Sequence, residues 1–143
     1  KHPRPQRMGQ TEPFANYIGQ KYNIPVVRKW TELVDNQWKD FLNMWTPNAY
    51  HFNLDPEPHP GDQAIQCAIV GTINIGGNND SHKILFPDTA GNDLNQLEEK
   101  IKLYLTSEEA YFNAIEYAWN KVNEIYSFEA VKSRIEKIVS QYS

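Results

Sequence analysis

Residues 57–93 read EPHPGDQAIQCAIVGTINIGGNNDSHKILFPDTAGND. This stretch predicts, in order, an acidic proline-rich loop, an apolar helix from near Gly61, a strand over residues 72–75, a polar turn at Gly76 and Gly77, and a strand that ends at Pro87. In open parallel sheets, ligands lie beyond the carboxyl ends of the strands. The loop after Ile75 and the start of the helix near Gly61 are therefore where we expect a binding site.

The residues before this stretch continue the alternation of helix and strand. Phe14, Ile18 and Tyr22 share one face of a predicted helix, with Thr11 as a possible N-cap and Pro13 in its first turn. Three further elements are predicted: a strand over 24–28, a helix over 37–45 and a half-buried strand over 50–54. This order predicts an α/β fold with a parallel sheet and right-handed crossovers.

Residues 93–143 change in character and predict three consecutive helices. Asp93 with Gln96, and Thr106 with Glu109, form capping-box patterns, and Ser127 can cap the third helix. The apolar face of that third helix comprises Phe128, Val131, Ile135, Ile138 and Val139. We expect all three helices to cover the sheet.

Composition excludes several classes of function. The 143 residues, 40% of them hydrophobic, suffice for one domain over 1–143, and the formal net charge of −4 gives no general attraction for nucleic acid or an anionic membrane. No apolar run has the roughly 20 residues that a membrane span needs. The single cysteine, Cys67, lies in an apolar helical run, where we interpret it as a packing residue in a reducing, cytoplasmic setting.

Two kinds of site were weighed from the residues themselves. The opening KHPRPQRMG is a basic, glycine-terminated loop before a helix, which suits a phosphate group as well as it suits a solvated terminus. A metal site is disfavoured, because the available His and carboxylate residues lack a recognised ligand spacing. Those residues are Asp55, Glu57, His59, Asp62, Asp80 and His82.

The combination of these motifs resembles the carboxyl-terminal half of group 1, retaining-type glycosyltransferases with the two-domain GT-B architecture. GTINI at residues 71–75 stands where that family has a GTPVV strand, Gly76-Gly77 where it has a glycine turn, and residues 87–93 where it has the boundary to the last helices. The resemblance implies a Rossmann-like parallel sheet flanked by helices, with the C-terminal helices packed over it. It also implies that the chain is a donor-binding fragment of a longer protein, which holds an N-terminal acceptor domain.

The resemblance also implies a set of ligand contacts for a nucleotide diphosphate sugar, which is the donor substrate. Arg4 and Arg7 would contact the diphosphate, and Glu57 and the helix start at Gly61 would orient the sugar. Gln66 would face the ribose, and Gly76, Gly77 and Asn78 would add backbone contacts. The scheme requires neither a metal ion nor a further cofactor.

Two departures from the family pattern have chemical consequences. Glu57 lies one residue farther from the glycine than usual, and Gln66 replaces a glutamate, so a charge-assisted bond to the ribose is lost. A lone half can bind a donor but should transfer a hexose poorly, because transfer needs both reactants held in line. The alternative is a non-catalytic α/β module whose aromatic-rich surface contacts a partner domain or a glycan.

Overall fold

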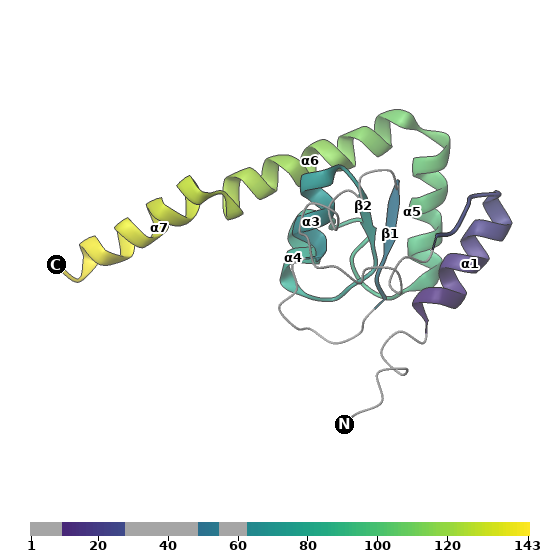
Figure 1. The fold of residues 1–143 in the computed structure, drawn as a ribbon, viewed down its shortest axis with the longest axis horizontal. Helices are drawn as coiled ribbons and strands as arrows, with labels where there is room; N and C mark the ends of the chain where they lie inside the picture. Colours follow the sequence, from purple (N-terminus) through teal and green to yellow (C-terminus); the bar gives the residue numbers. More distant parts are fainter. Residues whose placement is uncertain (1–9, 28–48, 55–62) are drawn as a thin grey trace, which may run out of the picture.

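A computed structural model of the chain describes residues 10–27, 49–54 and 63–143. Within these residues the protein is mostly helical, with a small parallel sheet at its centre (Figure 1). The elements in chain order are α1 (Thr11–Tyr22), β1 (Tyr50–Phe52), α3 (Gln63–Val70), β2 (Ile73–Ile75), α4 (Asp80–Leu85), α5 (Leu94–Thr106), α6 (Glu108–Tyr126) and α7 (Phe128–Gln141).

The sheet consists, in the described part of the chain, of β1 and β2 paired in parallel. Tyr50 lies opposite Ile73 and Phe52 opposite Ile75, and α3 lies between the two strands in the sequence. Both isoleucines are fully buried, as expected for a strand covered on both faces. The predicted parallel pairing is confirmed for these two strands, but a larger Rossmann-like sheet is not.

The core joins the sheet to every described helix except α7. Small buried residues of α3, among them Ala64 and Ala68, let that helix lie close to β2. Phe14 of α1 meets Phe52 of β1 edge to face, with ring centroids 6.0 Å apart. From the C-terminal helices, the core takes Leu97, Ile101, Tyr104, Ala118 and Val122.

Two of the predicted strands are wrong. The run that ends at Pro87 instead contributes Ile84 and Leu85 to the helix α4. That helix begins where the Asn79 side chain accepts a hydrogen bond from the His82 backbone N–H at 2.9 Å and caps the first turn. Residues 24–27 form no strand either: they follow the left-handed Asn23 that ends α1, and Val26 and Val27 are exposed. The helix predicted over 37–45 lies outside the described residues.

Side-chain caps define where the last three helices begin. Asp93 accepts hydrogen bonds from the backbone N–H groups of Asn95 and Gln96, and Ser127 accepts one from Ala130, as predicted. The second cap is Ser107, which accepts from Ala110 at 3.1 Å, and not the neighbouring Thr106. The prediction was wrong by one residue because the Thr106 hydroxyl donates to the carbonyl of Lys102 and completes α5 instead.

The helix α7 does not cover the sheet. It extends away from the rest of the fold as a continuation of α6, and none of its residues is buried (Figure 1). Ser127 ends α6 and begins α7, so a single non-helical residue joins them. The expectation that all three C-terminal helices pack over the sheet is therefore wrong for α7. None of the described helices has the length and apolarity needed for a membrane crossing.

Candidate functional site

The turn that follows β2 is built on two glycines with left-handed backbone angles. Gly76 has φ +90° and Gly77 has φ +93°, a region that residues with a Cβ rarely adopt. A Cβ on Gly76 would lie 2.5 Å from the carbonyl oxygen of Asn53, and a Cβ on Gly77 would overlap the ring of His82. The chain can pass this closely over β1 and α4 only with glycine at both positions.

Hydrogen bonds hold this glycine turn in one conformation. The Gly76 N–H donates to the Thr89 carbonyl at 2.7 Å, and the Gly91 N–H donates to the Gly77 carbonyl at 2.6 Å. The buried side chain of Asn74 donates to the Gly76 carbonyl, while the Thr89 hydroxyl donates to the Asn74 carbonyl. Gly76 and Gly77 are both buried, and the Gly76 amide is bonded inside the protein, so Asn78, which is half-buried, is the residue of this turn that a ligand could reach.

Two histidines lie near the glycine turn. His51 is opposite Asn74 in the register of the sheet, and the His82 ring lies directly against Gly77. Burial lowers the pKa of His51 to about 4, and the charge of nearby His82 adds to the effect. His51 is therefore neutral at pH 7 and adds no positive charge near the turn.

The helix α3 presents its polar residues to the interior. Gln66 is 5% exposed, and Cys67 is fully buried with its Sγ 3.9 Å from Asn74 Oδ1. Burial raises the pKa of the Cys67 thiol, which keeps it protonated and unreactive. Cys67 thus fills the space between α3 and β2, in agreement with the packing role expected from the sequence.

The start of α1 lies beside the glycine turn. The Leu54 backbone N–H, two residues beyond β1, donates to the Thr11 hydroxyl at 3.0 Å. The side chain of the same Leu54 would be 2.5 Å from a Cβ on Gly76. Thr11 is therefore not the N-cap that we predicted: Gln10 takes that position without a side-chain cap bond, and Thr11 instead ties α1 to the end of β1.

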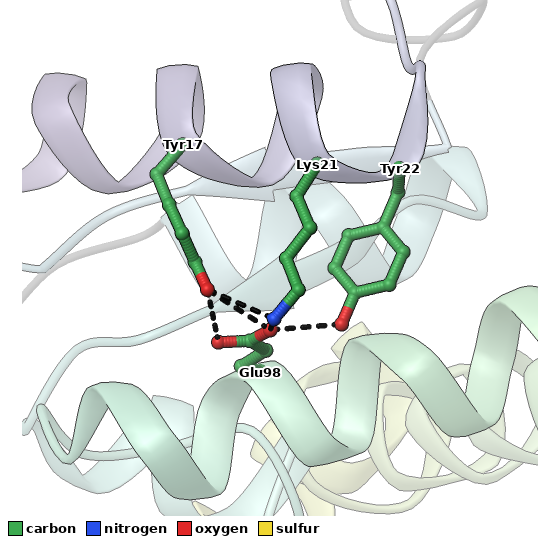
Figure 2. A network of polar contacts seen from close by, with 4 residues as sticks. All are labelled: Tyr17, Lys21, Tyr22 and Glu98. Carbon is green, nitrogen blue, oxygen red and sulfur yellow. Dashed lines mark hydrogen bonds and ion pairs between the residues drawn. The ribbon is translucent and has the colours of Figure 1, made fainter.

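A polar network connects the other end of α1 to α5 (Figure 2). The Glu98 carboxylate of α5 accepts hydrogen bonds from the hydroxyls of Tyr22 at 2.8 Å and Tyr17 at 3.1 Å, and forms an ion pair with Lys21. The Lys21 ammonium also donates to the Tyr17 hydroxyl at 2.9 Å. The bond from Lys21, followed by that from Tyr22, lowers the pKa of Glu98, and the same carboxylate raises the pKa of Lys21.

Sequence reasoning missed this network. Tyr17 and Lys21 are four residues apart and share a helix face, which is a visible signal. Their acceptor, Glu98, lies 77 residues beyond Lys21, on the helix α5. Nothing in the local pattern distinguishes Glu98 from its neighbour Glu99.

The residues predicted to bind a donor fall into two groups. Gly76, Gly77 and Asn78 lie together on the turn after β2, and Gln66 lies in α3. Arg4, Arg7, Glu57 and Gly61 lie outside the described residues. Over the ranges that the structure describes, no three His, Cys, Asp or Glu residues gather as a metal site would need.

Comparison with known proteins identifies no family for this chain. No family model, curated protein or solved structure gives a significant match to this chain.

Proposed function

We propose that this chain is the nucleotide-sugar-binding half of a GT-B glycosyltransferase, which transfers a hexose from a nucleotide diphosphate sugar to a glycan or other acceptor. The unit β1–α3–β2 is parallel, and the glycine turn lies at the carboxyl end of β2. This is the end at which such sheets bind ligands. The proposal assigns the diphosphate to the space next to that turn.

The observation that carries the proposal is the position of α1. Its first residue, Thr11, is bonded to Leu54, which itself lies against Gly76. Arg4 and Arg7 precede α1 by only a few residues, and the first residue of α1 lies next to the glycine turn. The proposal has Arg4 and Arg7 meet a diphosphate held beside this turn.

The chemistry of the proposed reaction is electrostatic. Arg4 and Arg7 would neutralise the negative charge that grows on the departing diphosphate, which is the largest catalytic contribution in many group transfers. Glu57 and Gly61 would orient the sugar. Gln66 would face the ribose, and its side chain in α3 is 5% exposed. The scheme uses no metal ion, and the single cysteine agrees with a cytoplasmic setting.

Transfer requires a second domain that binds the acceptor. The apolar face of α7, formed by Phe128, Val131, Ile135, Ile138 and Val139, is exposed. Contiguous apolar surface of this kind is typical of a contact with another protein surface. We therefore include the acceptor domain of a longer protein among the partners of this chain.

The test is a calorimetric titration of the chain with UDP, GDP and their sugars. We expect one nucleotide to bind, and Arg7→Ala to weaken the binding at least about tenfold by removing a charge-assisted contact to phosphate. Lys132→Ala is the matched control, because it removes one positive charge from an exposed site on α7 and should leave the affinity unchanged. The proposal fails if the unaltered chain binds none of these compounds.

The exposed face of α7 also favours a second candidate function, a non-catalytic module that binds a partner domain or a glycan. That module would bind its partner equally well with and without a nucleotide. A pull-down with the neighbouring domain, repeated with excess UDP and GDP, separates the two functions when it is read beside the titration.

A further inference from the structure

The solvent-facing sides of α6 and α7 carry matching patterns of apolar and charged side chains. On each helix an apolar residue is followed by a charge at the fourth position after it and by a second apolar residue at the seventh, and all six are exposed: Phe112, Glu116 and Trp119 on α6, and Phe128, Lys132 and Ile135 on α7. Residues at this spacing share one face of a helix. We propose that α7 of one copy of this chain docks on α6 of a second copy, whose own α7 docks in return. The inference goes beyond the proposed function and does not depend on nucleotide binding.

Large apolar side chains dominate both of these faces. Phe112 and Trp119 of α6 are 61% and 46% exposed. The α7 seam repeats at alternating spacings of three and four residues: Phe128, Val131, Ile135 and Ile138. This alternation is typical of a helix that packs lengthwise against another helix. Removal of the two faces from water is therefore the favourable contribution to docking.

The charges beside the α7 seam favour α6 of the second copy over its α7. Lys132 and Arg134 flank the seam on its two sides, and α7 has no acidic residue at a flanking position. Two α7 helices packed together would thus bring basic flanks together with no acid beside them. On α6, Glu116 lies between the two exposed aromatic residues, and the helix as a whole has four glutamates and one lysine. Opposite charges therefore match α7 with α6.

The equal spacing also sets the direction of the contact. An antiparallel α7 places its two apolar residues level with the two aromatic residues of α6, and Lys132 then falls within one residue of the level of Glu116. At about 100° per residue, both charges lie on the same side of their apolar stripes. Antiparallel helices bring these two sides together, whereas parallel helices keep them apart. The docked helices are therefore antiparallel.

The joint between α6 and α7 leaves the α7 seam accessible to a second copy. The Arg134 guanidinium donates to the Ile125 carbonyl near the end of α6, and Ser127 caps the start of α7. These contacts hold α7 extended from the body of the fold, so its seam does not turn back onto α6 of its own chain (Figure 1). Each contact covers only a few helical turns, which is typical of weak association. Each copy therefore keeps its fold when the pair separates.

The experiment is sedimentation equilibrium from micromolar to millimolar chain concentrations. We expect the molar mass to rise from the 16.6 kDa of one chain to twice that value. Glu116→Lys and Lys132→Glu should each weaken association about tenfold, because each places like charges together at both contacts of the pair. Both substitutions in one chain should restore association to within about threefold of the unaltered chain, since the charges exchange places.

The matched control is Glu99→Lys, which changes the net charge as Glu116→Lys does, at an exposed site on α5. It should leave association unchanged, and circular dichroism checks that every variant is folded. Recovery of association in the double variant supports the docked pair. Full association in Glu116→Lys overturns it, as does a double variant that fails to recover.

The mass of the unaltered chain is equally decisive. A mass that rises beyond two chains overturns the closed pair, because the contact is then not returned by the second copy. A mass of one chain at every concentration overturns the inference as well. The exposed face of α7 then belongs to a different partner, such as the acceptor domain.

Discussion

Individual residues at the glycine turn carry sharply different constraints. Gly77 and Gly91 pair with each other, and both have positive φ angles, +93° and +99°. A Cβ at Gly77 would meet the His82 ring, whereas a Cβ at Gly91 would have no heavy atom within 4 Å. An alanine at Gly77 would therefore suffer both steric overlap and backbone strain, whereas an alanine at Gly91 would suffer backbone strain alone.

We expect Gly77→Ala to destabilise the protein by about 2–4 kcal/mol, because strain and overlap both act there. Gly91→Ala should cost only about 1 kcal/mol, since the left-handed backbone is its one penalty. Urea unfolding monitored by circular dichroism measures both values. Equal destabilisation by the two substitutions would contradict the close packing of His82 under the turn.

His51 makes the stability of the fold depend on pH. Its pKa in the folded chain is about 4, below the value of about 6.5 expected when it is unfolded. The folded state thus binds fewer protons, so this contribution is fully present above about pH 6.5 and is lost as the pH falls toward 4. The loss is on the order of 3 kcal/mol for a shift of this size.

The test is the free energy of unfolding measured from pH 7 to pH 4 for the unaltered chain and for His51→Gln. The substitution should flatten the dependence in this range, because glutamine does not titrate. A profile with the same slope in both chains would mean that other groups cause the acid sensitivity.

At the scale of elements, α7 stands apart from the cooperative fold. None of its residues is buried, and Phe128 and Val139 are 77% and 59% exposed. In proteins, helices gain most of their stability from packing of an apolar face, so α7 adds little to the core. Its charged residues give it a local ion pair, Lys132 with Glu136 at 3.8 Å, which contributes weakly on an exposed surface.

A chain that ends at Ser127 should therefore keep its fold. We expect its melting temperature to stay within about 3 °C of the full chain, a shift equivalent to less than about 1 kcal/mol. The helical signal should fall, and binding of a hydrophobic dye should decrease because the apolar face is gone. Scanning calorimetry and dye fluorescence provide the measurements, and a large drop in melting temperature would show that α7 packs on the body of the fold.

For the molecule as a whole, the sequence predicted what depends on local patterns. The helix over residues 11–22, the strand at 73–75, its parallel partner and the caps at Asp93 and Ser127 follow from periodicity and from side chains near the elements themselves. The positive φ of the glycine turn agrees with the turn predicted at Gly76 and Gly77.

The remaining features depend on contacts that local patterns do not contain. An apolar run before Pro87 fits a strand as well as a helix, and the cap at Asn79 decided between them. The partners Thr11 and Leu54 are 43 residues apart, and Lys21 and Glu98 are 77 residues apart. Only the folded chain shows that Glu98, among many surface carboxylates, accepts the hydrogen bonds from Tyr17, Lys21 and Tyr22 of α1.

The single residue that joins the two last helices has an evolutionary consequence. Ser127 has an extended backbone and ends one helix while capping the next, so the direction of the terminal helix depends on one joint. Each residue advances a helix by about 100°, so one inserted or deleted residue near the start of α7 would turn its apolar stripe away from any surface it meets. Related chains should therefore accept substitutions around this joint far more readily than changes in its length.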